Sequence, residues 1–504
     1  MTAPTESTGD GLVVDGSSGS GARGEHPTRP VRRLACRGVD WLRGHSVIAV
    51  FWVVAVLIRL AIAAAYRPSS LQWMDAQRFA RVGWSTFGDF WAPAGYAGFL
   101  AALRLISDQL ALVTATQHVL GMVTAGLLAA AAARMGLRRP WNLMAGTVVA
   151  FGGDYMFLEH LVMTETLFIT AIALGVCAAV RCLEDHNWRW AALASFAFAA
   201  SALVRGNALV LNAVLPLCLL GGISTLHASW RALVASIAPG AAFITGYVVV
   251  ATVVGPYTGL WEMNGWHLYS RAAPFADCEQ LRVDDQDADI ARLCEDVPAS
   301  QRFGPYHYSW SPDSPARQAW GLDPARSDDL RRFAVDAILR QPDDYLHAVA
   351  EDLVRVVVPG FRASPGHGQL LDTFEFDHRD PEVERLIANA LAERYSGVRP
   401  EIHGAGLATA YQRATRLPGL AVPLAITGAL VGLVRHRGAR RRQLLLSLLV
   451  GSALLLAPIF LLTWDYRYTL PALPFLLLAG LIGCFAERDR GTPIVADGAS
   501  TGDE

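Results

Sequence analysis

The fold class of this chain follows from one stretch near its N-terminus, Val47 to Tyr66, which reads VIAVFWVVAVLIRLAIAAAY. The stretch is apolar apart from Arg59 and is long enough for a helix to cross a bilayer. The positive-inside rule places its N-terminal side in the cytoplasm, because an arginine cluster precedes it: Arg29, Arg32, Arg33, Arg37 and Arg43. We therefore predict an integral membrane protein in which the residues just after Tyr66 lie outside the cytoplasm.

The composition of the whole chain supports this class. Of its 504 residues, 53% are hydrophobic and only 17% are charged, whereas soluble domains carry about 25% charged residues. The sequence lacks a basic stretch interleaved with aromatic residues, which nucleic-acid-binding surfaces usually have. We therefore expect membrane lipids as partners, and no nucleic acid.

Nine further apolar runs predict helices, and arginine-rich connections alternate between them as the positive-inside rule requires. The pattern predicts an all-α polytopic membrane protein with about ten transmembrane helices and both termini in the cytoplasm. We expect it in a bacterial plasma membrane. The nine runs are Leu110–Met135, Trp141–Phe157, Thr166–Leu183, Trp188–Leu203, Ala208–Leu220, Ala232–Val254, Leu417–Arg435, Leu444–Thr463 and Tyr466–Phe485.

The distribution of polar residues divides the chain into five parts. The longest polar region shows helical patterns and predicts an extracytoplasmic α-rich domain. Apolar residues 93–105, flanked by proline and glycine, predict a surface or re-entrant helix. The parts are a disordered cytoplasmic tail with a basic juxtamembrane end (1–44), an N-terminal transmembrane catalytic module (45–254) with outer loops 67–92 and 154–165, the extracytoplasmic domain (255–416), C-terminal transmembrane helices (417–486) and a cytoplasmic tail (487–504).

Two of the seven cysteines, Cys278 and Cys294, fall in the polar region. An oxidising compartment outside the cytoplasm would allow them to pair. Spacing along the sequence does not establish the geometry of a bridge, so a disulfide and two free thiols both stay open.

Asp75 is the first candidate for chemistry. It follows the first span directly, in the stretch Trp73-Met74-Asp75-Ala76-Gln77-Arg78-Phe79-Ala80, and is expected close to the outer membrane surface. A carboxylate there can act as a general base toward an acceptor hydroxyl within hydrogen-bond reach. The alternative is a solvated acid in a loop.

The second outer connection carries acids and a histidine at a helix–helix junction, namely Asp154, Glu159, His160 and Glu165. Glu165 enters the next apolar helix. An ionisable group at that depth is costly and is a candidate for function. The alternative is an acid at a helix N-terminus, which the helix dipole favours.

Two outer arginines, Arg205 and Arg467, stand between apolar helices against the positive-inside trend. A guanidinium there can hold a lipid phosphate through two parallel hydrogen bonds, or its side chain can extend to lipid headgroups. Together with the outer acids, they predict a phosphate-bearing, membrane-borne donor with a base nearby.

These motifs resemble those of the GT-C superfamily of integral membrane glycosyltransferases that use polyprenyl-phosphate sugars, in particular protein O-mannosyltransferases and the aminoarabinose transferases of lipid A. Two positions depart from the family pattern: Ala97 and Gly206 stand where proline is usual. The matching segments are Asp75, Arg78, Phe79 and Ala80 for an acidic-x-x-Arg-aromatic-Ala pattern, Met163–Phe168 for a Ser-Glu helix start, Ala202–Asn207 for a Leu-x-Arg segment, and Arg467, Tyr468 and Pro471 for Arg-Tyr-x-x-Pro.

The resemblance implies a GT-C-like helical core whose outer loops form the active site. It implies that Asp75 is the general base and that Glu165 shapes the sugar site or holds a metal. A divalent metal stays open as a cofactor, since only some members of the superfamily require one. The implied donor-binding residues are Arg78, Arg205, Arg467 and Tyr468, and candidates for an acceptor or sugar site are Glu159, His160 and Tyr96.

A polyprenyl-phosphate sugar is the expected donor, and a protein or a cell-envelope glycan the expected acceptor. Two other readings compete with an enzyme. One is a transporter or flippase of a lipid-linked substrate, in which the outer acids and arginines would line a path. The second is a non-catalytic GT-C-like binding protein, which would keep the fold without needing Asp75.

Overall fold

The computed structural model describes residues 29–66, 74–81, 91–220, 226–255, 259–281, 288–359, 374–378, 380–398 and 404–487. In these ranges the regular structure is helical and includes no strand, which confirms the all-α class. The chain forms two compact units, Met1–Val50 and Phe51–Glu504. The expected tails fall outside the described residues at 1–28 and 488–504. Helix α1 (Arg29–Ala65) begins within the basic end of the first expected tail.

Six helical segments are long and apolar enough to cross a membrane. At about 1.5 Å per residue, 20 residues match the thickness of the hydrocarbon core, so these helices are those of a membrane protein. The segments are Ser46–Ala65 of α1, Leu110–Arg134 (α4), Glu165–Asp185 (α7), Trp230–Val254 (within α10, Leu226–Ala235, and α11, Ala238–Val254), Gly438–Leu461 (α23) and Tyr466–Phe485 (α24).

Four shorter apolar helices correspond to the remaining runs of the sequence. They are Trp141–Phe151 (η2, Trp141–Leu143, with α5, Met144–Phe151), Trp188–Val204 (α8), Gly206–Leu220 (η3, Gly206–Ala213, with α9, Val214–Leu220) and Ala421–Arg435 (α22).

One predicted helix, Trp141–Phe157, is divided in the structure. Gly152 is extended, and α6 (Gly153–His160) starts after it. A Cβ atom on Gly152 would lie 2.3 Å from the carbonyl oxygen of Val148, so the chain bends there more tightly than a side chain permits.

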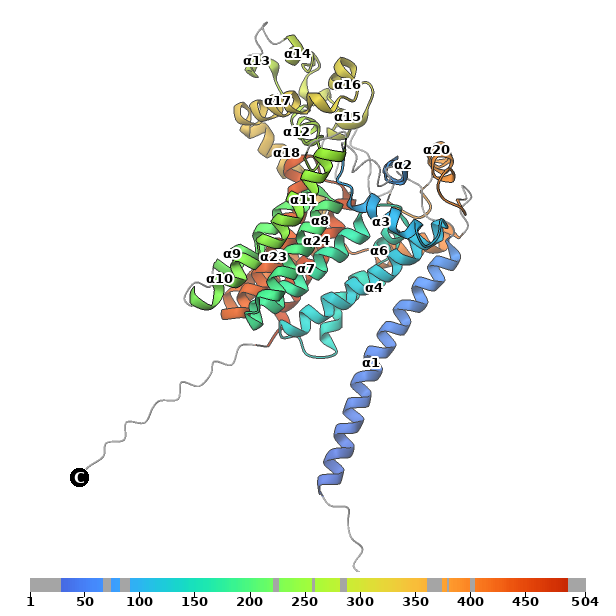
Figure 1. Ribbon diagram of the computed structural model, residues 1–504, viewed down its shortest axis with the longest axis vertical. Helices are drawn as coiled ribbons and strands as arrows, with labels where there is room; N and C mark the ends of the chain where they lie inside the picture. The colour runs from blue at the N-terminus through green and yellow to red at the C-terminus, as the bar shows by residue number, and fades with distance from the viewer. Residues whose placement is uncertain are drawn as a thin grey trace, which may run out of the picture. The chain divides into compact units, whose positions relative to one another are not determined.

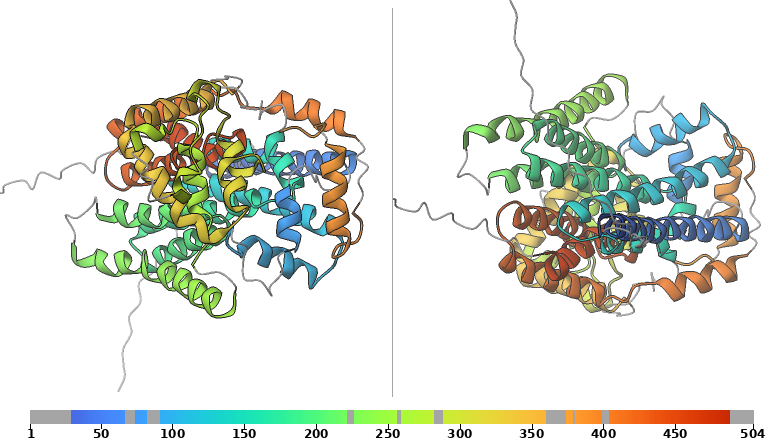
Figure 2. Two further views of the ribbon diagram at one scale, coloured as in Figure 1. Left: turned by 90° about the horizontal axis from the view of Figure 1, so that it is seen from above. Right: turned by 90° about the horizontal axis from the view of Figure 1, so that it is seen from below.

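The helices of the bundle pack closely through glycines. Helices α22, α23 and α24 pack against one another, α7 packs against α23 and α24, and α8 packs against α7 (Figures 1 and 2). A Cβ atom added at Gly432 of α22 would lie 2.4 Å from the Cα of Gly483, and one at Gly483 of α24 would lie 2.0 Å from the oxygen of Gly428. Small residues at this spacing let two backbones approach where lipid provides no hydrophobic driving force.

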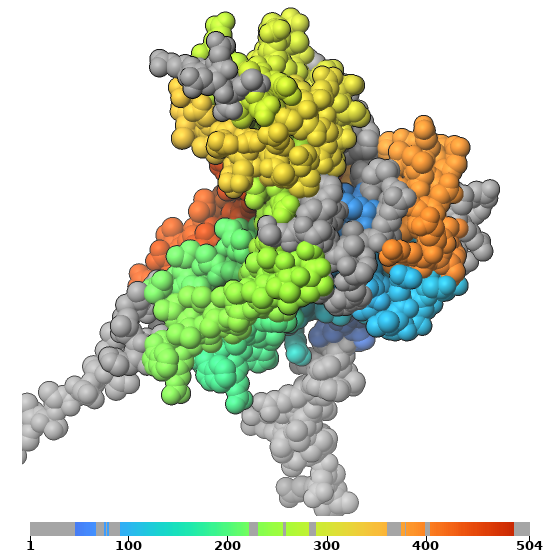
Figure 3. Space-filling view, turned by 45° about the horizontal axis from the view of Figure 1, so that its top comes forward, coloured from blue at the N-terminus to red at the C-terminus, as the bar shows by residue number. Residues whose placement is uncertain are grey.

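The residues that connect α11 to α22 form the polar part. The helices α12 to α18 gather at one end of the bundle (Figures 1 and 3); α12 to α17 surround a core that includes Trp266, Tyr269 and Phe333, whereas α18 packs against the core of the bundle. Their bounds are α12 (Asn264–Ala272), α13 (Cys278–Leu281), α14 (Ala288–Ala291), η5 (Ala299–Gln301), α15 (Pro305–Trp310), α16 (Pro315–Trp320), η6 (Pro324–Arg326), α17 (Ser327–Arg340) and α18 (Pro342–Val357).

Two further helices belong to this part: α20 (Pro381–Ala392) packs against α2 (Met74–Arg81), close to α3 (Gly95–Arg104), as the view from above in Figure 2 shows, and α21 (Ala405–Thr415) packs against α6. The predicted surface helix is α3. Most of the predicted outer loop 67–92 lies outside the described residues, apart from α2 and its last two residues.

Two covalent or ionic links hold the polar part together. Cys278 and Cys294 form a disulfide with their Cα atoms 5.9 Å apart, which decides the pairing that the sequence left open. The Asp352 carboxylate of α18 accepts hydrogen bonds from Arg271 of α12 at 2.6 Å and from the backbone N–H of Trp464 at 3.0 Å. Asp352 therefore links this part to the connection between α23 and α24. Arg467 lies just after this connection, in the first turn of α24.

Candidate functional site

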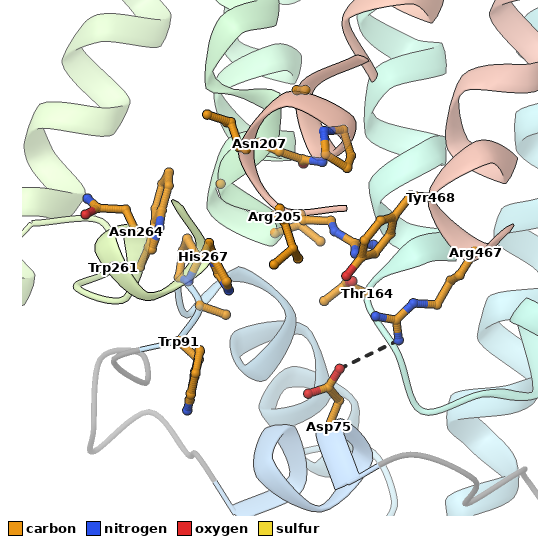
Figure 4. Close-up of a pocket in the computed structure, with 18 of the residues that line it drawn as sticks. Asp75, Trp91, Thr164, Arg205, Asn207, Trp261, Asn264, His267, Arg467 and Tyr468 are labelled. Atoms are coloured by element: carbon orange, nitrogen blue, oxygen red, sulfur yellow. Dashed lines mark ion pairs between the residues drawn. The ribbon is translucent and has the colours of Figure 1, made fainter. Parts of the chain in front are cut away.

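A cavity of about 380 Å³ lies where α2, α12 and the starts of α7 and α24 meet the connection after α8 (Figure 4). Five of the residues for which chemistry was predicted line it, although they come from four separate segments. These five are Asp75, Arg78, Glu165, Arg205 and Arg467, and the predicted donor-binding residue Tyr468 is a sixth that lines it. The cavity is therefore the candidate active site.

Asp75 lies in the first turn of α2, where the helix dipole favours a carboxylate. Its oxygens lie 3.2 Å from Nη1 of Arg78 and 3.6 Å from Nη1 of Arg467 (Figure 4). Burial disfavours its charged form, but nearby arginines, Arg78 first and then Arg467 and Arg205, outweigh burial and hold the pKa of this carboxyl below the ordinary value of 3.8. Asp75 is thus a carboxylate at neutral pH.

Glu165 holds two of the arginines next to each other. It is fully buried in the first turn of α7. Its Oε1 atom lies 2.8 Å from Nη1 of Arg205 and 3.3 Å from Nε of Arg467. Since one carboxylate contacts both guanidinium groups and has no exposed surface, Glu165 positions the arginines.

Tyr468 and Asp465 fix the arginines further. The Tyr468 ring centre lies 4.7 Å from Cζ of Arg205 and 5.3 Å from Cζ of Arg467, within cation–π range. Asp465 caps α24 by accepting a hydrogen bond from the backbone N–H of Arg467 at 2.8 Å. It also accepts one at 2.7 Å from the hydroxyl of Tyr306, which belongs to the polar part.

The charges around the cavity favour an anion. Arg331 of α17 also lines the cavity but pairs with Asp328 at 2.9 Å, so the three other arginines against two carboxylates leave an excess of one positive charge. Burial, followed by Arg78 and Arg205, lowers the pKa of His267 to about 4, so that this histidine is neutral. In the described part of the chain, no three His, Cys, Asp or Glu side chains are grouped for a metal ion, and both carboxylates of the cavity face arginines.

The structure places Glu159 outside this cavity, in a separate buried network. Its carboxylate pairs with Arg59 at 2.9 Å and contacts Nδ1 of His118 at 2.5 Å. The single charge of the first apolar stretch thereby has its counter-ion in α6. This pairing explains how an arginine is accommodated within an apolar helix.

Tyr96 and His160 surround the same network. The Tyr96 hydroxyl donates to Oε1 of Gln117 at 2.9 Å, and the Gln117 amide donates to the backbone oxygen of Glu159 at 2.9 Å. His160 contacts the ring of His118 edge-on, with centroids 4.7 Å apart. None of the three predicted acceptor or sugar residues lines the cavity, and their role in binding stays a prediction.

Sequence reasoning missed the aromatic and amide residues on another side of the cavity. They come mainly from the polar part: Trp91, Trp261, Asn264, His267 and Trp310. The one related signal in the sequence is the departure from proline at Gly206, which does not by itself name these residues. A Cβ atom on Gly206 would lie 2.3 Å from the Trp261 ring, so the departure from proline at Gly206 makes room for this ring beside Arg205.

An apolar groove of about 640 Å³ begins beside the cavity. Small residues of α3 and the side chains of Phe243 and Val250 of α11 line it. The cavity and the groove adjoin at two points of the chain. Pro93 lines the cavity and the next residue, Ala94, lines the groove; likewise Val204 lines the cavity and the preceding residue, Leu203, lines the groove. A charged cavity next to an apolar groove matches a ligand with an anionic head and an apolar tail.

Comparison of the chain with protein-family models, with curated proteins and with solved structures found no match. The residues and the geometry of the cavity are therefore the basis for assigning a function.

Proposed function

We propose that this chain is an integral membrane glycosyltransferase of the GT-C type, which moves a sugar from a polyprenyl-phosphate donor to an acceptor on the extracytoplasmic face. The observation that carries the proposal is the arginine-rich cavity, with an excess of one positive charge, beside an apolar groove. Polyprenyl-phosphate sugars combine a phosphate, which guanidinium groups bind well, with a long apolar chain. A nucleotide-sugar donor would not need the groove.

Arg205 and Arg467 bind the donor phosphate in this proposal, and Glu165 keeps them adjacent at 2.8 and 3.3 Å. A phosphate that takes Arg467 would weaken its ion pair with Asp75. The pKa of Asp75 would then rise, because one of the charges that lower it is neutralised. Donor binding would thus make Asp75 a stronger base when it is needed.

The transfer itself is a single displacement. Asp75 accepts the proton of the acceptor hydroxyl while the acceptor oxygen forms a bond to the anomeric carbon. The bond between that carbon and the phosphate oxygen breaks, and the electron pair leaves with the lipid phosphate, which the arginines stabilise. The expected result is inversion at the anomeric carbon. Product with retained configuration would contradict the single displacement.

The proposal includes the topology. The four shorter apolar helices cross the membrane together with the six longer ones, giving ten spans around a GT-C-like core. Both termini are cytoplasmic, and the helices α12 to α18 lie outside, in the bacterial cell envelope. The disulfide between Cys278 and Cys294 supports this side, because disulfides persist in oxidising compartments.

Sugar transfer from radiolabelled polyprenyl-phosphate donors tests the function. The assay compares membranes with the wild-type chain, Asp75→Asn and Asp313→Asn at equal protein level. Asp313 is an exposed acid of the polar part and serves as the matched control. We expect Asp75→Asn to lower transfer by at least about 100-fold, the usual contribution of a general base, and Asp313→Asn to leave it unchanged.

Other results assign other functions. Equal transfer by all three chains removes Asp75 as the base. A broad donor panel without transfer, together with lipid-linked sugar that changes leaflet in reconstituted vesicles, indicates the flippase. Binding of donor without transfer or movement indicates the non-catalytic protein.

A further inference from the structure

The cavity has a second wall that the proposed chemistry does not use. In Figure 4, Trp91, Trp261 and His267 lie across the cavity from Asp75 and Arg467. Trp310 lines the same side. We call the set Trp91, Trp261, His267 and Trp310 the aromatic wall. Three of its four members belong to the polar part of the chain, which carries none of the motif residues.

The rings of the aromatic wall form a layered surface. The Trp91 and Trp310 centroids lie 4.6 Å apart with the planes at 30°, and the Trp91 and His267 centroids lie 5.7 Å apart at 40°. Trp91 is 8% exposed, whereas Trp310 is 43% exposed. An indole of this size left open inside a cavity indicates a contact surface for a ligand, since its burial would contribute favourable free energy.

Polar groups next to the aromatic wall select the kind of ligand. Asn264 is exposed at the start of α12 and lines the cavity. Asn207 lines it too, and its Oδ1 atom has no hydrogen-bond partner among the described residues. His267 is neutral, so its ring nitrogens can exchange hydrogen bonds with hydroxyls. Flat apolar rings combined with uncharged amide and imidazole groups match a ligand that has a C–H face and hydroxyl groups.

The position of the wall distinguishes the acceptor from the donor. In an in-line displacement the acceptor oxygen approaches the anomeric carbon from the side opposite the leaving phosphate. Arg467, which holds the phosphate, lies with Asp75 on one side of the cavity, whereas Trp91, Trp261 and His267 lie across from it and Arg205 lies between the two groups (Figure 4). We infer that the aromatic wall binds a sugar ring of a carbohydrate acceptor, so that the acceptor is a glycan rather than a protein side chain. This inference rests on the proposed function.

Binding of soluble acceptor probes to the full-length protein in detergent tests the inference. The probes are trisaccharides of mannose, arabinose, galactose and glucose, and a serine- and threonine-containing peptide, each followed by saturation-transfer NMR. We compare the wild type with Trp310→Ala, Trp310→Phe and Phe303→Ala. Phe303 is an exposed aromatic residue of the same part that does not line the cavity.

We expect at least one trisaccharide to bind, with affinity about tenfold lower in Trp310→Ala, from the loss of one ring contact. Trp310→Phe keeps a flat ring and should recover most of the affinity, and Phe303→Ala should match the wild type. In the transfer assay, Trp310→Ala should raise KM for the glycan without lowering kcat. Equal glycan binding by all variants, no glycan binding at all, or binding of the peptide alone would overturn the inference.

Undecaprenyl phosphate binding, measured in the same samples, keeps the two proposals separate. Glycan binding is a property of the aromatic wall, whereas lipid-phosphate binding is a property of Arg205 and Arg467. Loss of lipid-phosphate binding in Arg467→Gln, with glycan binding retained, supports both assignments. A wild type that binds no lipid phosphate refutes the proposed function, and one that binds lipid phosphate but no glycan refutes only the inference.

Discussion

Three arginines control the protonation of one residue, Asp75. Burial alone would favour the neutral carboxylic acid, and the lowered pKa therefore depends on Arg78, Arg467 and Arg205. The consequence for chemistry is a base that is ionised at every physiological pH but is weak until a positive charge is withdrawn. In the proposed reaction, the donor phosphate withdraws it.

The pH dependence of transfer tests this control. The wild-type kcat/KM, which reports the protein without donor, should fall only when the pH drops below 3.8, since the pKa of Asp75 is lowered and only the carboxylate accepts a proton. Arg78→Gln removes the largest of the favourable charges, so the pKa of Asp75 rises and the acidic fall of the rate moves to higher pH. Stability follows the same sign, because the contribution of a carboxyl with a lowered pKa is lost as the pH falls through that pKa.

Arg331→Gln is the control for this experiment. Arg331 also lines the cavity but is not among the charges that shift Asp75. The fall of the transfer rate at low pH should therefore occur at the same pH in Arg331→Gln as in the wild type. If the rate of Arg78→Gln fell at the same pH as that of the wild type, a group other than Asp75 would limit the rate at low pH.

At the scale of elements, the Asp352 carboxylate of α18 links this helix to α12 and to the connection between α23 and α24, and it is shared between two buried arginines. Asp352 contacts Arg271 at 2.6 Å and Arg355 at 3.1 Å, and all three side chains are nearly inaccessible to solvent. Asp352 also accepts from the backbone of Trp464. This contact places the polar part over the connection that leads to Arg467.

Asp352→Asn should destabilise the protein strongly. The change leaves two buried guanidinium groups without a counter-ion, which costs about 3–5 kcal/mol. Thermal unfolding in detergent, followed by tryptophan fluorescence, should show a clearly lower midpoint. Asp343→Asn on the exposed first turn of the same helix should change the free energy of unfolding by less than about 1 kcal/mol. Similar midpoints for the two variants would mean that Asp352 does not anchor α18.

At the scale of the whole molecule, the disulfide and one free thiol report on sidedness. Cys278 and Cys294 are bonded in the polar part, and Cys484 is exposed at the C-terminal end of α24. The proposed topology puts the disulfide outside and Cys484 on the cytoplasmic side. The three cysteines therefore test both membrane faces in one unmodified chain.

Labelling of intact cells with a membrane-impermeant maleimide should leave Cys278 and Cys294 unlabelled until an impermeant reductant is added. Both should then react from outside, while Cys484 should react only after the membrane is opened. Peptide mass mapping identifies the sites. Labelling of Cys484 in intact cells would reverse the topology, and labelling of Cys278 without reductant would contradict the disulfide.

The sequence by itself determined most of the helical framework. Ten apolar runs correspond to six long and four short helices, because a backbone in lipid must satisfy its hydrogen bonds within its own segment. That rule is local, so runs such as Tyr466–Phe485 match their helices residue for residue. The sequence also shows which ionisable residues lie at the ends of these helices. It therefore indicates Asp75, Glu165, Arg205 and Arg467 individually as candidates for function.

Only the tertiary structure decided which of these groups meet. It joins Asp75, Glu165, Arg205 and Arg467 in one cavity, whereas Glu159 faces Arg59 in a separate network. It also brings the aromatic wall to the cavity from residues with no motif. The physical reason is that contacts between distant segments depend on how closely their helices approach. Close approach depends on small residues such as Gly206 and Gly432, and the sequence alone does not show which residues lie against them.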